Sequence, residues 1–241
     1  MRLRHPSVLA AYAGRNDGAY CRDLGALGLG MVTIGGLSVD DVAKSQTKKM
    51  IERGRSEFFV HNHEDYIREQ VAIARESEAL VAVNIRSATV GGYLDAAAVI
   101  AEAGGIVEID AHCRQDEMTS IGAGQALLYD FSKLQEILWQ IKNELGVTTV
   151  LKFRGNIVPE LAIANAVEGC CDVLHVDAML KGKDAPDFSV FREIPDDLFL
   201  IGNNSVRDTA SAQAILEYCD AFSFARIADD HDAVREIVSG V

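Results

Sequence analysis

The chain has 241 residues, with 23 Lys and Arg against 36 Asp and Glu, and its formal net charge is −13. Its 49% hydrophobic and 24% charged residues are typical of a globular protein and exclude a disordered one. No apolar run approaches the ~18–20 residues that cross a bilayer, and the short apolar N-terminal segment does not fit a signal peptide. We therefore expect one soluble, cytoplasmic domain spanning residues 1–241, without a membrane partner.

The acidic net charge indicates which binding partners to expect, and the cysteines indicate the redox state of the compartment. Proteins that bind phosphate backbones are usually basic or carry a basic stripe, so this charge disfavours tRNA as a partner, although a local patch would suffice. The 5 Cys are odd in number and lack CxxC spacing, which favours a reducing compartment. The sequence leaves the oligomeric state open, with a homodimer as one option.

Short apolar runs of the kind that form buried parallel strands recur along the chain. They cover residues 8–13, 31–36, 79–85, 105–111, 148–153, 172–176, 198–202 and 221–225. Helical patterns lie between them, at 38–54, 64–78, 93–105, 131–146, 158–169, 204–219 and 229–240.

Eight strands that alternate with helices over this length predict a (β/α)8 TIM barrel in the α/β class. A doubly wound open sheet is the alternative. The stretch near residues 38–65 is longer than one barrel repeat needs, so we expect an insertion there, formed by an additional strand or hairpin around 57–60.

Polar and titratable residues collect where the apolar runs end. These residues are Asn84, Arg86, Asp110, His112, Cys113, Lys152, Arg154, His175, Asp177, Asn203, Asn204 and Arg226. Active sites of TIM barrels lie at the C-terminal ends of the strands. The pattern therefore predicts a functional site at that end of the barrel.

Cys113 is the strongest candidate in this set for a catalytic residue. It follows a predicted strand and has His112 and Arg114 as neighbours. Positive charge nearby lowers the pKa of a thiol, so we expect a reactive group that acts as a nucleophile or an acid. The alternative is a small buried hydrophobic residue, the commoner fate of a free cysteine.

Metal binding is not predicted. His112 and His175 with nearby aspartates could in principle bind a metal ion, but no HExxH or tight HxH spacing joins them. His61 and His63 do form an HxH pair, in a segment typical of a solvated surface loop.

Longer motifs resemble the dihydrouridine synthase family of FMN-dependent TIM barrels, in particular a short archaeal branch, and more distantly the dihydroorotate dehydrogenases. The resemblance runs over roughly residues 6–230. LAAYAGRNDGAYCR is similar to the family's LAPMAGVTDxPFR, and EIDAHCRQDEM to its E-I-N-x-G-C-P loop. TVLKFRGN is similar to its TVKIR strand, and LIGNNSV and AFSFARIA to its two phosphate loops.

The resemblance implies roles for individual residues. Cys113 falls on the acid that protonates the pyrimidine C5, and Lys152 on the lysine that contacts the flavin. The flavin-binding positions map to Ala11, Tyr12, Asn84, Lys152, His175, Asn203, Asn204, Ala225 and Arg226. Asp110, His112 and Arg154 are the implied substrate contacts. The implied cofactor is FMN, and the implied reaction is hydride transfer between the flavin and a pyrimidine-like C=C bond.

The chain also departs from the family's pattern. Asp110 replaces the family's asparagine, Arg114 replaces its proline, and Asn204 and Ala225 replace glycines. We expect the C-terminal helical RNA-binding domain of the family to be absent. A small-molecule or nucleotide substrate is therefore an alternative to tRNA.

Two other functions remain open. One is a flavin-free lyase or isomerase that acts on a phosphorylated small molecule through Lys152 and Asp110, since a lysine at a strand end suits Schiff-base chemistry. The other is a barrel that binds without catalysing.

Overall fold

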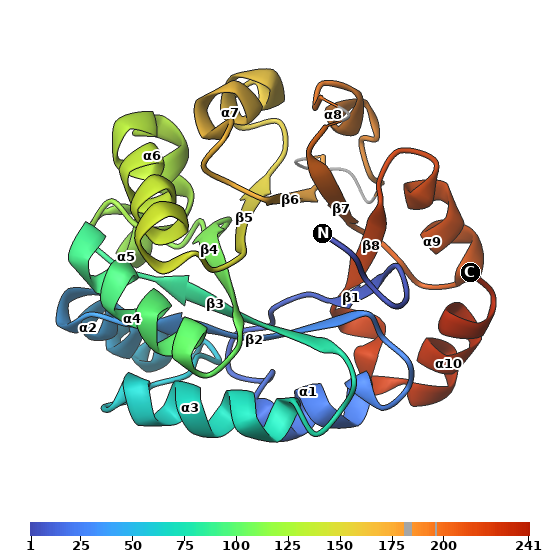
Figure 1. Ribbon diagram of the computed structural model, residues 1–241, viewed down its shortest axis with the longest axis horizontal. Helices are drawn as coiled ribbons and strands as arrows, with labels where there is room; N and C mark the ends of the chain where they lie inside the picture. Colours follow the sequence, from blue (N-terminus) through green and yellow to red (C-terminus); the bar gives the residue numbers. More distant parts are fainter. Residues whose placement is uncertain (181–184, 196) are drawn as a thin grey trace.

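The computed structural model describes residues 1–180, 185–195 and 197–241. In these residues eight parallel strands pair in the order β1 to β8, and β8 pairs with β1, so that the sheet closes. Figure 1 shows the helices arranged around this barrel. The predicted (β/α)8 TIM barrel is confirmed, and the open sheet is excluded.

All the predicted strands form, within a few residues of their expected bounds. They are β1 Ser7–Leu9, β2 Met31–Ser38, β3 Leu80–Arg86, β4 Ile106–Ala111, β5 Thr149–Arg154, β6 Val173–Asp177, β7 Phe199–Asn203 and β8 Ala221–Phe224. Their side chains are buried on both faces of the sheet, which explains why the runs do not alternate between apolar and polar residues.

The α-helices are α1 Gly18–Gly25, α2 Asp41–Glu52, α3 His63–Ala74, α4 Val90–Glu102, α5 Asp116–Thr119, α6 Phe131–Gln140, α7 Glu160–Val167, α8 Ser189–Arg192, α9 Thr209–Leu216 and α10 His231–Ser239. Short turns of other helix types are η1 Gly124–Tyr129, η2 Ile141–Leu145 and η3 Arg226–Asp229. Many of the helices begin at a residue whose side chain accepts a backbone N–H, as Asp40 does for α2 and Thr89 for α4. Helices α1, α5 and α8 were not predicted. No helix in the described residues is long and apolar enough to cross a membrane.

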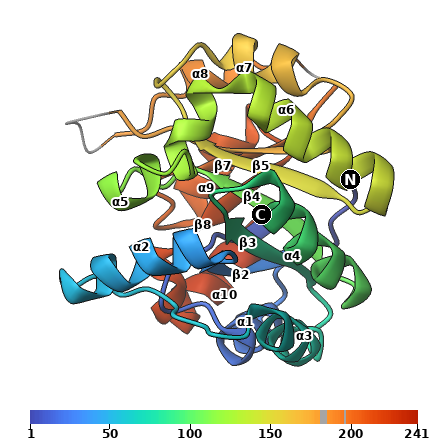
Figure 2. The same cartoon turned by 90° about the vertical axis from the view of Figure 1, so that its left-hand side faces the viewer.

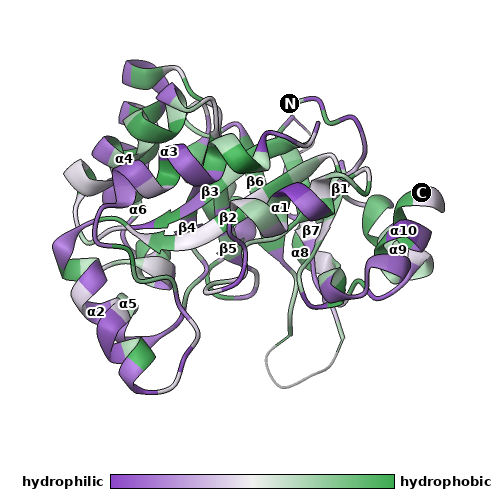
Figure 3. Cartoon of the chain, turned by 90° about the horizontal axis from the view of Figure 1, so that it is seen from below, coloured by the Kyte–Doolittle hydropathy of each residue, from purple (hydrophilic) through white to green (hydrophobic). Residues whose placement is uncertain are grey.

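The core has two layers. The larger one lies between the barrel and the helices, and Figure 3 shows hydrophobic segments among the strands with hydrophilic ones along outer helices and loops. The smaller one fills the N-terminal end of the barrel interior, and its buried members are Val8, Met31, Ala82, Val150, Val173, Ile201 and Ala221. Four of these strands carry a polar residue two positions further along, on the same face of the sheet: Asn84, Lys152, His175 and Ser223. The barrel interior therefore changes from apolar to polar toward its C-terminal end.

The insertion near residues 38–65 differs from the prediction. Helices α2 and α3 form as expected, but residues 53–62 between them contain no strand or hairpin. The apolar residues of EFFV are explained by local packing, because Phe58 packs against the core and Phe59 contacts the ring of His61. Figure 2 shows α2 beside α5, and Arg53 at the end of α2 forms an ion pair with Glu117 of α5.

Candidate functional site

Two adjoining cavities lie at the C-terminal ends of the strands. The β7–β8 cavity, of about 370 Å³, is lined by Ala10, Ala11, Tyr12, His112, Lys152, Asp177, Met179, Asn203–Arg207 and Phe224–Ile227. The β3–β5 cavity, of about 590 Å³, is lined mainly by the ends of β3, β4 and β5 and by residues 54–57. Ala11, Tyr12, His112, Lys152 and Arg226 line both. These volumes are in the range of small-molecule and cofactor sites.

Lys152 lies where the two cavities meet. Strand β5 directs its side chain into the barrel, where only 4% of the residue is exposed. Among the described residues it forms no hydrogen bond and no ion pair, although its charge acts on Glu108. A buried ammonium without a hydrogen-bond acceptor is costly, so this geometry favours a ligand that accepts a hydrogen bond from Lys152.

Below Lys152 a chain of hydrogen bonds crosses the barrel interior. Asn84 Nδ2 donates to Glu108 Oε1 over 2.8 Å, and His175 Nδ1 lies 2.7 Å from Glu108 Oε2. His175 Nε2 lies 2.7 Å from Ser223 Oγ. Burial alone would raise the pKa of Glu108, but the charge of Lys152 and the hydrogen bonds from His175 and Asn84 lower it to about 2. Burial also lowers the pKa of His175, so a neutral imidazole donates to the Glu108 carboxylate and accepts from Ser223.

The lowered pKa of Glu108 predicts a loss of stability in acid. The unfolded chain binds a proton at Glu108 near its ordinary pKa of 4.5, whereas the folded protein does so only near 2. Stabilisation on the order of 3 kcal/mol is therefore present above pH 4.5 and is lost as the pH falls toward 2. Urea titrations across this window measure the change, and in Glu108→Gln the slope with pH should be shallower. An identical slope in that variant would contradict the assignment.

Asp110 and Arg86 set the position of Cys113. Asp110 Oδ1 accepts the backbone N–H groups of His112 and Cys113, each over 2.9 Å. Arg86 is 2% exposed; its Nη1 lies 3.5 Å from Cys113 Sγ, and its Nη2 donates to Glu57 Oε2 over 2.8 Å. Glu57 comes from the segment between α2 and α3, so the insertion contributes directly to the site.

The expected lowering of the Cys113 pKa is wrong. Burial and the Asp110 carboxylate raise the pKa of the thiol, and the opposing charge of Arg86 is too weak to reverse this. His112 and Arg114 are neighbours in sequence, but they are not among the groups that lower it. At neutral pH Cys113 is therefore a thiol, which suits a proton donor better than a nucleophile.

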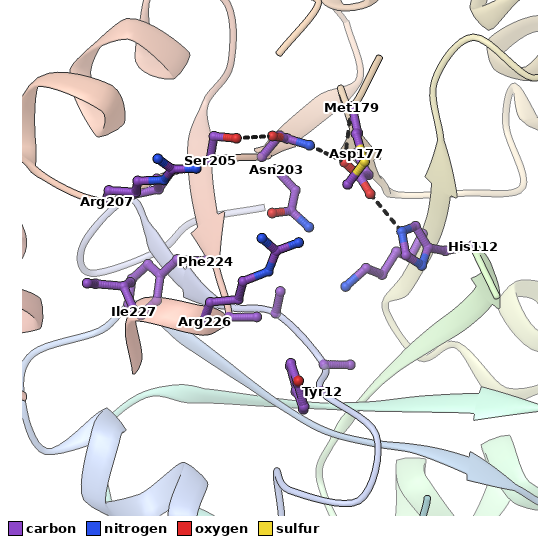
Figure 4. A pocket seen from close by; sticks show the side chains of 16 residues that line it. Tyr12, His112, Asp177, Met179, Asn203, Ser205, Arg207, Phe224, Arg226 and Ile227 are labelled. Atoms are coloured by element: carbon purple, nitrogen blue, oxygen red, sulfur yellow. Dashed lines mark hydrogen bonds and ion pairs between the residues drawn. The ribbon is translucent and has the colours of Figure 1, made fainter. Parts of the chain in front are cut away.

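On the other side of Lys152, Asp177 organises His112 and Arg154. Asp177 Oδ2 lies 2.8 Å from His112 Nε2 and 3.5 Å from Arg154 Nη1, while Asn204 Nδ2 donates to Oδ1 over 2.9 Å. Burial would raise the pKa of Asp177, but the hydrogen bond from His112 and the other contacts hold it well below its ordinary value. Figure 4 shows His112 directed at Asp177, and the Arg226 side chain extending into the pocket.

The loops after β7 and β8 present donors to the β7–β8 cavity. Asn204 and Ser205 adopt positive φ values of 149° and 56°, so the loop keeps a backbone shape that glycine favours although neither residue is glycine. The backbone N–H groups of Asn204, Ser205 and Arg226 donate to no described residue. The Arg226 guanidinium likewise has no ion pair among the described residues. Such a set of donors suits an anion.

All but one of the predicted site residues line these cavities. The exception is His175, which is fully buried below the cavity floor and lines neither of them. Sequence reasoning missed Glu57 and Glu108. For Glu108 a signal was present, because a carboxylate inside the apolar run GIVEIDA, two residues before Asp110, shares a face with it.

The described residues contain no group of three or more His, Cys, Asp or Glu side chains arranged to hold a metal ion. The other cysteines, Cys21, Cys170, Cys171 and Cys219, are buried among apolar residues.

Comparisons with known structures show the fold. The chain is similar to morphinone reductase, with a TM-score of 0.68 and 13% identity, covering 98% of this chain and 86% of that one. For 2-naphthoyl-CoA reductase the TM-score is 0.70 at 14% identity, covering 93% of this chain and 48% of that one. For a tryptophan synthase of Mycobacterium tuberculosis the TM-score is 0.62 at 16% identity, covering 99% of this chain and 93% of that one. Reductases and a synthase share this architecture, so the similarity establishes the barrel and not the reaction.

No model of a known protein family matches the chain. The sequence is 38% identical over 233 residues to the uncharacterized protein MJ0144 of Methanocaldococcus jannaschii, covering 93% of this chain and 90% of that protein. At this identity and coverage, the chain belongs to the family of MJ0144.

Proposed function

We propose that the protein is an FMN-dependent oxidoreductase that transfers hydride between the flavin and a pyrimidine-like C=C bond, with Cys113 as the general acid. One observation carries the proposal. Lys152, a buried cation without a hydrogen-bond partner among the described residues, lies between a cavity with anion donors and a cavity that holds a protonated cysteine. The resemblance to dihydrouridine synthases and the fold shared with two reductases add support.

The residues present fit the cofactor. The loops after β7 and β8, with Arg226 and the free N–H groups, would hold the FMN phosphate. Lys152 would donate to the polar edge of the ring, and Ala11 and Tyr12, which line both cavities, would lie beside it. Ala225 has a φ of −132°, outside the positive range that favours glycine, so the backbone there does not require a glycine.

Reduction of a C=C bond adds a hydride to one carbon and a proton to the other, and bound FMN in its reduced form would supply the hydride. Cys113, which lines the β3–β5 cavity, would donate the proton. The thiolate left behind is stabilised by Arg86, whose Nη1 lies 3.5 Å from Sγ. Asp110 holds the Cys113 loop through two backbone N–H groups, which fixes the direction of the thiol. Solvent then returns the proton to Cys113.

Lys152→Met is expected to weaken FMN binding about tenfold or more, since a hydrogen bond from a charged donor is lost. The measurement is a titration of purified protein with FMN, followed by the flavin spectrum. The matched control is Lys142→Met, because Lys142 pairs with Asp172 away from both cavities. The proposal is supported if the unmodified protein binds FMN stoichiometrically, if Lys152→Met weakens this binding, and if Lys142→Met leaves it unchanged. Failure of the unmodified protein to bind saturating FMN would overturn it and leave flavin-free chemistry at Lys152 and Asp110, or binding alone, to be tested.

A further inference from the structure

The site is positively charged although the chain is strongly acidic. Among the described residues that line the two cavities, seven are cations: Arg55, Arg86, Arg114, Lys152, Arg154, Arg207 and Arg226. Three are carboxylates: Glu57, Asp110 and Asp177. The whole chain has 36 Asp and Glu and a net charge of −13, so the cavities have the opposite charge balance to the chain as a whole. A cavity lined by one sign of charge attracts ligands of the other sign.

The three carboxylates are already engaged by the protein. Glu57 pairs with Arg86 and Arg55, and Asp110 accepts the N–H groups of its own loop. Asp177 bonds His112, Arg154 and Asn204. None of the three is free to neutralise a further cation.

Arg114 has no such partner. Among the described residues it forms no hydrogen bond and no ion pair, and it follows Cys113 on the wall of the β3–β5 cavity. Arg154 lines the same cavity, and the charge of Arg114 acts on it. Burial lowers the pKa of Arg154, and the charge of Arg114 lowers it further, against the opposing effect of Asp177. Asp177 partly offsets the charge of Arg154, whereas Arg114 has no counter-charge among the described residues, so a bound anion would relieve the repulsion between the two guanidinium groups.

We propose that Arg114 and Arg154 form a binding subsite for an anionic group, a carboxylate or a phosphate, on a small substrate that occupies the β3–β5 cavity beside Cys113. This inference rests on the proposed function, in which that cavity takes the substrate while Lys152 and Arg226 hold the cofactor. The subsite selects for an anion next to the C=C bond and against neutral analogues of the same shape. A polyanion such as RNA is disfavoured by the net charge of the chain, −13.

The test compares ligands that differ only in charge. Dissociation constants are measured by calorimetry for cinnamate and cinnamamide, and for uridine 5′-monophosphate and uridine, on protein with and without saturating FMN. At least one anion should bind about tenfold or more tightly than its neutral counterpart. A preference for cinnamate identifies a carboxylate subsite, and a preference for the nucleotide identifies a phosphate subsite.

Substitutions of single arginines test which residue causes the preference for the anion. Arg114→Gln should remove most of the preference by weakening the anion about tenfold and leaving the neutral ligand unchanged. Arg235→Gln, at an exposed arginine of α10 outside both cavities, is the matched control and should change nothing. Equal binding of anion and neutral ligand, a preference that survives Arg114→Gln, or a preference removed instead by Arg226→Gln would overturn the inference. Tighter binding of an RNA hairpin than of either small anion, equally sensitive to Arg114→Gln, would also overturn it.

The two proposals fail in different ways. If FMN does not bind but the anion preference is present and depends on Arg114, the flavin function falls and the anion subsite stands. If FMN binds and charged and neutral ligands bind alike, the flavin function stands and the subsite falls.

Discussion

Replacing Cys113 with alanine is expected to lower the rate of substrate reduction by a factor of about 10²–10⁴, with FMN still bound. Cys113 lines the β3–β5 cavity, and burial together with the Asp110 carboxylate raises the pKa of its thiol. The group therefore carries a proton at neutral pH and can donate it. Alanine removes the proton but leaves Lys152 and the anion donors of the β7–β8 cavity in place.

The rate is measured as the anaerobic reoxidation of the reduced, FMN-loaded protein by an unsaturated acceptor. Cys170→Ala is the control, because the Cys170 thiol donates to Val167 O at the opposite end of the barrel. Catalysis requires the protonated thiol of Cys113. The ordinary pKa of a thiol is 9.0, and burial raises the pKa of Cys113 above this value. The rate should therefore stay constant through neutral pH and fall only above pH 9.0. An unchanged rate in Cys113→Ala, or a rate that already falls near neutrality, would contradict the assignment.

The barrel could be predicted because its strands are encoded locally. Each strand is a short run rich in β-branched and other apolar residues, and the repeat of strand and helix allows few architectures. The same locality reveals the site residues at strand ends, because Lys152 or Asp110 directly after an apolar run is visible in the sequence. Closure of the barrel then brings these ends together at one opening, whatever the details of the loops.

The contacts below and beside the opening could not be predicted in this way. His175 bonds Glu108, 67 residues earlier, and Ser223, 48 residues later, so the chain of hydrogen bonds exists only once the barrel has closed. The pKa of Cys113 depends on burial and on Asp110 more than on its neighbours His112 and Arg114. Charge adjacent in sequence is therefore a poor guide to charge adjacent in space.

Glu57 is the clearest example of a residue hidden from sequence analysis. It lies in an irregular segment between two helices, beside apolar residues that suggested a strand. Its side chain is nevertheless 1% exposed and is paired with Arg86, which is 2% exposed, over 2.8 Å. Nothing in the local pattern distinguishes it from the solvated carboxylates of the same region.

Replacing Glu57 with alanine should therefore lower the free energy of unfolding by about 3 kcal/mol, because the buried Arg86 guanidinium loses its nearest counter-charge and keeps only Asp110, at 4.0 Å. Urea denaturation measures the change. Glu78→Ala is the matched control, since Glu78 pairs with Arg4 but its side chain is 91% exposed. We expect that control to lose less than about 1 kcal/mol. A loss in Glu57→Ala no larger than in Glu78→Ala would contradict the prediction.

A double variant separates stability from function. Replacing Glu57 with leucine and Arg86 with methionine removes both charges, and buried pairs exchanged for apolar residues commonly recover most of the stability. Arg86 also contacts Gly36 O and Cys113 Sγ, contacts that the double variant lacks. We therefore expect a stable protein that binds FMN but reduces substrate slowly. That outcome would mean that the insertion between α2 and α3 supplies Glu57 to hold Arg86 beside the thiol, whereas full activity in a stable double variant would mean that the pair is structural.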